Sequence, residues 1–260
     1  LLSEPNLQQQ LVEIGYQGKK LEELESLSAT EKANMLFIVQ DPYTSYYDAK
    51  VVRDFVALTQ KLDFEPILLP FKPNGKAMHI KGFLTRFSKT AKTQAEFLNR
   101  VAKLNVPLVG VDPAIVLSYR DEYKEALGNS RGDFHVLTAH EWLTNQLESN
   151  ALQSAVKNIA KSDHTFEWHL FPHCTESTFM PNSPKEWQHI FAQFGQTLKV
   201  EKVGCCGMAG VFGHEVQNQT MSKDIYDVSW GKKLQGKDSN HCLATGYSCR
   251  SQVKRYEKAI

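Results

Sequence analysis

Short apolar runs alternate with longer amphipathic stretches along the first half of the chain. Three apolar runs have the character of buried parallel strands: residues 35–41, which end at a polar residue, residues 65–71 and residues 106–113. Three stretches carry apolar side chains at helical spacing: residues 48–64, 92–104 and 114–127. Strands that alternate with helices predict an α/β fold built on a parallel sheet.

The second half of the chain repeats this order. Its predicted strands lie within residues 166–174, 198–204 and 241–249, and its predicted helices within residues 183–195, 222–234 and 250–260. When the halves are overlaid, Asp41 falls on Cys174, Pro73-Asn74-Gly75 falls near Cys205-Cys206-Gly207, and Pro113 falls on Cys249. We therefore expect an internal duplication, with two pseudo-repeated parallel-sheet halves and helices on both faces of each sheet.

The same patterns suggest three segments. Residues 1–33 read as amphipathic helices broken near Gly15 and Gly18, and we expect a linker or docking segment there. Residues 34–137 form a first repeat without cysteine, and residues 138–260 form a second repeat that carries all the thiols. The chain opens Leu1-Leu2-Ser3 without a methionine, so we expect a processed chain or a piece of a longer one.

Composition narrows the choice of partners. The chain has 260 residues, 42% of them apolar, and a formal net charge of +1, which fits a globular protein with a sizeable core. This charge gives no electrostatic reason to expect a nucleic-acid partner. No run approaches the roughly 20 apolar residues of a membrane helix, and no secretory signal opens the chain.

The cysteines carry the candidate chemistry. They are Cys174, Cys205, Cys206, Cys242 and Cys249. Clustered thiols in a chain of this length are more often metal or redox ligands than a disulfide scaffold. Four of them, all but Cys242, follow predicted parallel strands and should converge at the carboxyl ends of those strands. Thiolates are the usual ligands of zinc and of iron–sulfur clusters, but converging thiols can also oxidise, and buried cysteines can be plain core residues.

Glycines surround the adjacent pair Cys205-Cys206. Gly204 and Gly207 flank the pair and allow the backbone to wrap around a bound group with its amides directed inward, so both are predicted to bind a cofactor. No G-x-S-x-G elbow, phosphate-binding Lys-Ser/Thr or G-x-G-x-x-G after the first strand is present. We expect no catalytic residue within the 260 residues of this chain.

The segments "HCTES", "GCCGMAG" and "CLATGYSC" resemble the cysteine–cysteine–glycine domains of iron–sulfur oxidoreductases. A narrower resemblance is to the C-terminal region of bacterial FAD-linked oxidases with a fused iron–sulfur region, of the D-2-hydroxyglutarate or D-lactate dehydrogenase type. It covers about residues 34–256, and residues 173–252 are its specific part.

This resemblance implies part of an FAD- and iron–sulfur-dependent 2-hydroxy acid dehydrogenase, serving electron transfer from the flavin or completing its active site. It implies an iron–sulfur cluster or zinc on Cys174, Cys205, Cys206 and Cys249, with FAD in an upstream domain. The implied partners are upstream flavin and ferredoxin-like domains of the same polypeptide and an acceptor such as a quinone. It also implies a homo-oligomer, located in the cytoplasm or peripherally on the inner face of the cell membrane.

Two features depart from the family pattern. The first repeat has no cysteine, and the closing C-x-x-C has Gly246 at its first position and Cys249 at its second. Cys242 is a possible substitute ligand. Two other interpretations stay open: a zinc-binding structural or docking module without a redox role, and a thiol–disulfide switch.

Overall fold

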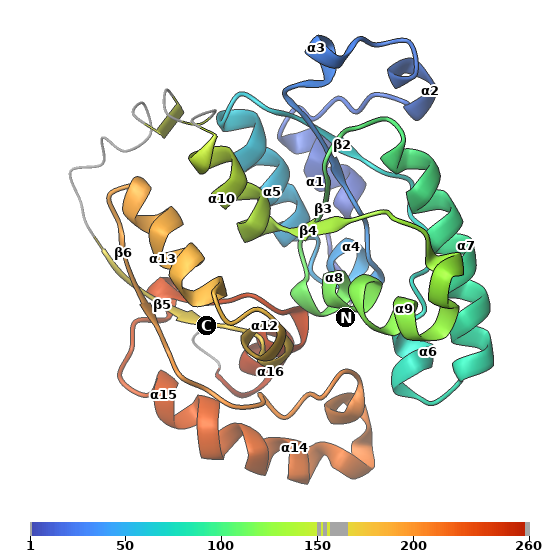
Figure 1. The fold of residues 1–260 in the computed structure, drawn as a ribbon. Helices are drawn as coiled ribbons and strands as arrows, with labels where there is room; N and C mark the ends of the chain where they lie inside the picture. The colour runs from blue at the N-terminus through green and yellow to red at the C-terminus, as the bar shows by residue number, and fades with distance from the viewer. Residues whose placement is uncertain (1, 150–151, 153–154, 157–165, 258–260) are drawn as a thin grey trace. The chain divides into compact units, whose positions relative to one another are not determined.

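The computed structural model describes residues 2–149, 152, 155–156 and 166–257. The chain divides into two compact units, Leu1–Trp142 and Leu143–Ile260. Each unit holds one parallel sheet with helices around it (Figure 1), which confirms the predicted α/β class with two parallel-sheet halves. Within the described ranges, no helix combines the length and the apolar character needed to cross a membrane.

The first unit is built on four parallel strands in the order β2-β1-β3-β4. They are β1 (Met35–Ile38), β2 (Glu65–Leu68), β3 (Leu108–Gly110) and β4 (Val136–Thr138). Its helices are α1 (Leu7–Glu13), α2 (Leu21–Leu24), α3 (Ala29–Lys32), α4 (Pro42–Tyr46), α5 (Ala49–Lys61), α6 (Lys76–Ile80), α7 (Leu84–Ala102), α8 (Pro113–Arg120) and α9 (Glu122–Leu127), with the 3-10 turn η1 (Gly128–Arg131). Helix α10 (Ala139–Glu148) runs across the boundary between the units.

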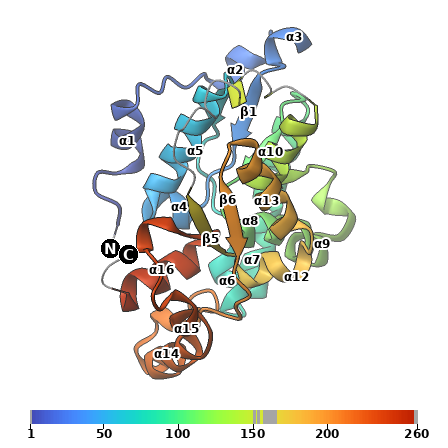
Figure 2. The same ribbon diagram turned by 90° about the vertical axis from the view of Figure 1, so that its left-hand side faces the viewer.

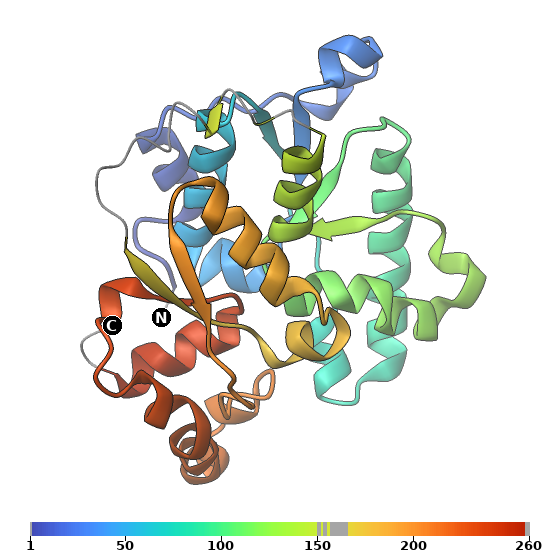
Figure 3. The ribbon, with the colours of Figure 1, turned by 60° about the vertical axis from the view of Figure 1, so that its left-hand side comes forward.

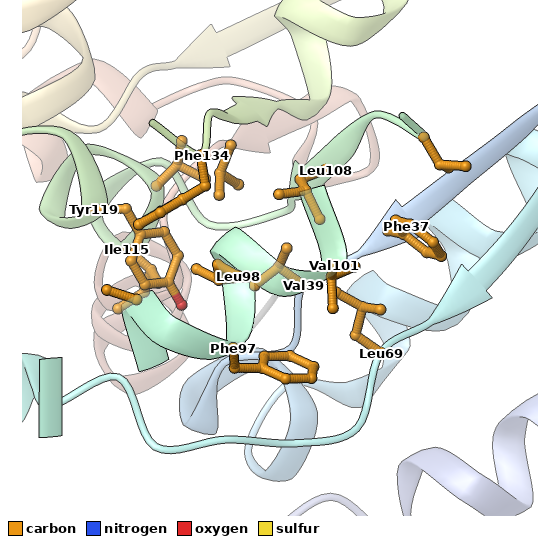
Figure 4. Close-up of a cluster of buried hydrophobic side chains, with 14 of the residues drawn as sticks. Phe37, Val39, Leu69, Phe97, Leu98, Val101, Leu108, Ile115, Tyr119 and Phe134 are labelled. Carbon is orange, nitrogen blue, oxygen red and sulfur yellow. The ribbon is translucent and has the colours of Figure 1, made fainter. Parts of the chain in front are cut away.

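The core of the first unit lies between its sheet and the helices that cover it. Helices α5 and α7 lie on opposite sides of the sheet (Figure 1), and each turns a stripe of buried apolar residues inward. Figure 4 shows Phe97, Leu98 and Val101 of α7 packed near Phe37 of β1 and Leu108 of β3. All of β1 and β3 is buried, which explains their continuous apolar sequences.

The N-terminal segment packs onto this unit. Leu24 is completely buried in the core that β1 and α7 share, and Leu11 is buried as well. The hydroxyl of Tyr16 accepts a hydrogen bond from the backbone N–H of Leu68 at 2.8 Å. Residues 1–33 contain α1 to α3, and the role of this segment as a linker or docking segment and the boundaries at residues 33 and 137 stay predictions.

The second unit has three parallel strands in the order β6-β5-β7. They are β5 (Glu167–Phe171), β6 (Thr197–Val200) and β7 (Cys242–Ala244). Its helices are α12 (Cys174–Phe179), α13 (Ser183–Gln193), α14 (Gln219–Tyr226), α15 (Lys232–Leu234) and α16 (Tyr247–Tyr256), with the short turns η2 (Phe212–His214), η3 (Val216–Asn218), η4 (Asp227–Gly231) and η5 (Ser239–His241). Figures 2 and 3 show β5 and β6 between α13 and α16, so helices cover both faces of the sheet.

The two sheets share one strand order. In each, the first strand is central, the second pairs on one side and the third on the other, giving β2-β1-β3 and β6-β5-β7. This common order supports the predicted duplication. Three elements of the first unit were not predicted: α4, which directly follows the first strand segment, β4, which is only three residues long, and α6, which begins after Gly75 in a stretch rich in turn residues.

Candidate functional site

Four thiols follow the strands of the second sheet. Cys174 is the first residue of α12, directly after β5, and Cys249 lies in the first turn of α16, directly after β7. Cys205 and Cys206 lie in the loop that follows β6. Because the carboxyl ends of parallel strands share one edge, segments distant in the sequence meet there.

The structure links these four sulfur atoms in series. The sulfur of Cys205 is hydrogen-bonded with the thiols of Cys174 and Cys206, and Cys206 is hydrogen-bonded with Cys249. Cys206 and Cys249 are buried in the core of the unit, whereas Cys174 and Cys205 are half-buried. These are the four cysteines that the sequence placed at this edge of the sheet, and their role as ligands stays a prediction.

Cys205 is the acceptor of this series. The thiols of Cys174 and Cys206 and the backbone N–H groups of Gly207 and Ala209 hold the pKa of Cys205 well below its usual range. The same hydrogen bonds, together with burial, raise the pKa of Cys174 and of Cys206. The arrangement thus stabilises one thiolate among neighbours that keep their protons.

The glycines give the loop its shape. Gly207 has a φ of +85°, and a Cβ there would come within 2.1 Å of the backbone oxygen of Ser222 in α14. The same two residues are joined by a hydrogen bond of 2.7 Å, which the Ser222 hydroxyl donates to the Gly207 carbonyl. The N–H of Gly204 donates to the Ser229 hydroxyl at 2.7 Å, which ties the other end of the loop to η4. The role of Gly204 and Gly207 in binding a cofactor stays a prediction.

Cys242 occupies a different place. It is the first residue of β7, in register with His169 of β5, and its thiol donates to the backbone oxygen of Asp238 at 3.4 Å. Among the described residues, no hydrogen bond joins Cys242 to the four linked thiols. Its proposed role as a substitute ligand stays a prediction.

Position 246 is filled by a neighbour. A Cβ on Gly246 would lie only 2.3 Å from Cδ2 of His173. A cysteine at this position would therefore displace the His173 ring, which is buried directly before Cys174. The first position of the C-x-x-C pattern is therefore glycine at a place where the His173 ring leaves no room for a side chain.

The sequence suggests Glu176 as a helix cap or a hydrogen-bond partner of a cluster sulfur, but the structure gives it a different role. It is completely buried in α12, and its carboxylate accepts hydrogen bonds from the hydroxyls of Ser183 and Thr245 and, at 3.1 Å, from the indole N–H of Trp187. These partners lie on α13 and on the loop before α16. Because they are remote from Glu176 in the sequence, no local motif marks the connection.

The first sheet carries oxygen and amide groups at its corresponding edge. Asp41 follows β1 and caps α4, Asp112 follows β3 and caps α8, and Asn74 lies in the loop after β2; all three are buried. Burial and the nearby Asp112 carboxylate raise the pKa of Asp41 to about 6. Asp41 and Asn74 lie at positions that the overlay of the two halves assigned to Cys174 and Cys206, and Asp112 directly precedes Pro113, which the overlay assigned to Cys249.

The geometry of the second unit bears on the metal predicted for it. Within the part of the chain that the structure describes, no group of three or more His, Cys, Asp or Glu side chains is arranged around a common point as metal ligands are. The four sulfurs form a hydrogen-bonded series instead. Their number and chemistry suit a thiophilic group, and binding one would require the thiols to exchange these hydrogen bonds for bonds to metal.

Comparison with known proteins gives the following relatives. No family model matches the chain. The chain is 80% identical over all 260 residues to a D-2-hydroxyglutarate dehydrogenase of Haemophilus influenzae, of which it covers 25%. It is 57% identical over 257 residues to a protein of the same name from Escherichia coli, covering 24% of it, and 40% identical over 232 residues to one from Pseudomonas putida, covering 22%. The chain spans about a quarter of the length of the curated relatives that it matches.

Proposed function

We propose that this chain is the C-terminal, thiol-bearing region of an FAD-dependent 2-hydroxy acid dehydrogenase, and that its linked cysteines hold an iron–sulfur cluster. The observation that carries the proposal is the convergence of Cys174, Cys205, Cys206 and Cys249 at one sheet edge. The high identity to proteins named D-2-hydroxyglutarate dehydrogenase supports the reaction class. FAD and the site of substrate oxidation then belong to the rest of the polypeptide.

The donor set suits this cofactor. Four cysteine ligands are enough for one four-iron cluster, and the half-buried Cys174 and Cys205 leave an approach from solvent. The N–H groups of Gly207 and Ala209 point at the Cys205 sulfur, where they would offset the negative charge of thiolate ligands. On the inner side, Trp230, Met208 and Phe171 surround the buried thiols and would keep water away.

In this proposal, the residues of this chain hold the cluster, shield it from water and fix its orientation. When bound, an iron–sulfur cluster supplies one-electron transfer, which would connect the two-electron oxidation of a 2-hydroxy acid at a flavin to an acceptor such as a quinone. The partners in this proposal are the upstream flavin and ferredoxin-like domains, in a homo-oligomer located in the cytoplasm or on the inner face of the membrane.

Two other functions have support from the same atoms. Four thiolates also suit zinc, which would make this region a structural or docking module. The hydrogen bond between the half-buried Cys174 and Cys205 favours a disulfide under oxidation, which would make the region a thiol switch.

The test compares full-length enzymes purified without oxygen. Iron, zinc and sulfide are measured per chain for the wild type, for Cys205→Ser and, as the matched control, for Cys242→Ser. The proposal expects Cys205→Ser to lose the iron of one cluster while Cys242→Ser keeps it. Equal iron in all three proteins would reject the proposal, and a loss of zinc alone in Cys205→Ser would favour the structural module. A switch predicts no change in metal but fewer titratable thiols in the wild type after mild oxidation.

A further inference from the structure

The two loops that carry Cys174 and Cys249 are joined by hydrogen bonds that involve no sulfur atom. We propose that Glu176, Thr245, His173 and Ser248 form a clamp that fixes these two loops against each other and so sets the positions of Cys174 and Cys249. The inference rests on the proposed function in one respect only: it expects the clamp to determine how well the thiols retain their cluster. The four residues are positioning residues and need not touch the bound group.

The first half of the clamp is a buried carboxylate. Glu176 lies in the same short helix as Cys174 and accepts a hydrogen bond from the hydroxyl of Thr245. Thr245 lies between β7 and α16, a few residues before Cys249. Its hydroxyl oxygen also accepts a hydrogen bond from the backbone N–H of His173 at 2.9 Å. One hydroxyl therefore connects the loop of Cys249 to both sides of Cys174.

The second half of the clamp is the His173 ring. Its Nδ1 atom accepts a hydrogen bond from the backbone N–H of Thr175 at 3.2 Å, so the ring hydrogen belongs on Nε2. Nε2 lies 3.1 Å from the hydroxyl of Ser248, the residue directly before Cys249. The ring packs against Gly246, where any side chain would collide with it. The histidine thus spans the two loops in one orientation.

The carboxylate is anchored from the other side as well. Ser183 and Trp187, both on α13, donate to the same Glu176 oxygen. Hydrogen bonds to a charged acceptor are stronger than neutral ones, and they are stronger still when buried. Glu176 is completely buried, so the loop that holds Thr245 is joined to a fixed part of the unit.

The position of the clamp explains its purpose. Cys174 and Cys249 are the two ends of the thiol series, each bonded to the Cys205-Cys206 loop but not directly to one another. Hydrogen bonds within the series disappear once the thiols lose their protons to bind a metal. The clamp involves no sulfur atom, so it persists in both states and holds the end ligands in place.

The experiment is done in the full-length enzyme and compares two substitutions, each of which removes one hydroxyl that donates to the Glu176 carboxylate. Thr245→Val removes the hydroxyl that joins the Cys249 loop to Glu176 and to His173. Ser183→Ala is the matched control. It also removes a hydroxyl that donates to Glu176, but this hydroxyl lies on α13, which carries no thiol. Thr245→Ser restores the hydroxyl and serves as the conservative rescue. Iron per chain, the cluster's electron paramagnetic resonance spectrum and the melting temperature are measured for each.

A second readout needs no metal. After removal of metal with a chelator, the rate at which maleimide labels Cys249 is followed by peptide mass spectrometry. We expect Thr245→Val to lower iron retention about tenfold, as the loss of a hydrogen-bond partner behind a metal ligand does. The labelling rate of Cys249 should rise by about the same factor. Ser183→Ala leaves Trp187 bonded to the same Glu176 oxygen, so it should lower the melting temperature comparably but leave both quantities near wild type, and Thr245→Ser should restore them.

The outcomes separate the two proposals. Equal iron retention and equal labelling in Thr245→Val and Ser183→Ala would overturn the clamp. Iron levels that do not depend on Cys205 would overturn the proposed function, and the labelling rate of Cys249 would then decide the clamp alone. If Thr245→Val does not fold, Ser248→Ala, which removes only the histidine contact, replaces it with the same expected direction.

Discussion

The thiol of Cys174 is hydrogen-bonded to the sulfur of Cys205, although the two residues follow different strands. Cys174 begins a helix after β5, and Cys205 lies in the glycine-rich loop after β6. Parallel pairing of β5 with β6 brings the two strand ends to one edge. The contact therefore follows from topology, and it creates an outer pair of half-buried thiols above an inner pair that is part of the core.

This division predicts the order in which the thiols react. In metal-free enzyme, Cys205 should be alkylated at least about tenfold faster than Cys206, because Cys205 is more exposed and its pKa is lowered whereas that of Cys206 is raised. Peptide mass spectrometry after short exposure to iodoacetamide measures both rates in one sample. Faster labelling of Cys206 would contradict the series of hydrogen bonds.

Gly207→Ala should destabilise the second unit strongly. A Cβ at this position would approach the Ser222 backbone oxygen to 2.1 Å, in addition to the strain of a positive φ. Gly236→Ala is the matched control, since Gly236 has a similar φ of +74° but no neighbour within 4 Å of its Cβ position.

We expect Gly236→Ala to cost about 1 kcal/mol and Gly207→Ala at least about 2 kcal/mol more, as strain and steric overlap add. Hydrogen exchange of peptides from α14 and β6 reports the local free energy of unfolding. Equal losses at the two positions would mean that the loop moves freely away from α14.

The first unit should lose stability as the pH rises from about 4 to about 6. The pKa of Asp41 rises from 3.8 to about 6 on folding, because of burial and the Asp112 carboxylate. A raised pKa favours the folded state fully below pH 3.8, and this contribution disappears as the pH passes 6. A shift of this size corresponds to about 3 kcal/mol.

Asp41→Asn isolates this effect, because asparagine caps a helix about as well as aspartate but does not ionise. Hydrogen exchange of β1 and β3 peptides is measured for wild type and variant at each pH. Comparing the two proteins at the same pH cancels the intrinsic pH dependence of amide exchange. The variant should be relatively more stable at pH 7 than at pH 4. A constant difference across that range would show that Asp41 keeps an ordinary pKa.

The N-terminal segment should contribute to the stability of the first unit. Leu24→Ala is expected to cost about 3 kcal/mol, because Leu24 is fully buried in the core with β1 and α7. Val12→Ala, on the same segment but 65% exposed, should cost almost nothing. Hydrogen exchange of β1 peptides compares the two. A negligible effect of Leu24→Ala would favour a loosely attached linker.

Much of the fold could be predicted because its signals are local. The apolar run at residues 35–41 and the helical spacing at residues 48–64 led directly to β1 and α5. By contrast, β4 covers only Val136–Thr138 and lacks the longer apolar run that marks the equally short β3 at residues 106–113, and α6 has no apolar stripe long enough to stand out from turn residues. Both depend on tertiary contacts for their existence.

The site was predictable to the extent that it depends on strand order. Cysteines after successive parallel strands must meet at one edge, so the set of four followed from their places in the sequence. Cys242 also lies near a strand, but at its start, which points it to a different set of neighbours. The link from Glu176 to Thr245 could not be predicted, because the two residues are far apart in the chain and the segments HCTES and CLATGYSC that contain them give no sign that these two side chains pair.

The burial of Cys206 and Cys249 has a consequence for how such a site can change during evolution. A protonated thiol behaves as a small apolar side chain, and a deprotonated one is a strong ligand. The same two residues therefore pack around Trp230 as core residues and, in the proposed function, would also be ligands. Few other side chains combine these properties, so replacing either cysteine would disturb the packing of the second unit as well as the proposed site. At the corresponding edge of the first sheet, Asp41 and Asp112 cap helices and Asn74 is buried, so oxygen and amide groups fill that edge without sulfur.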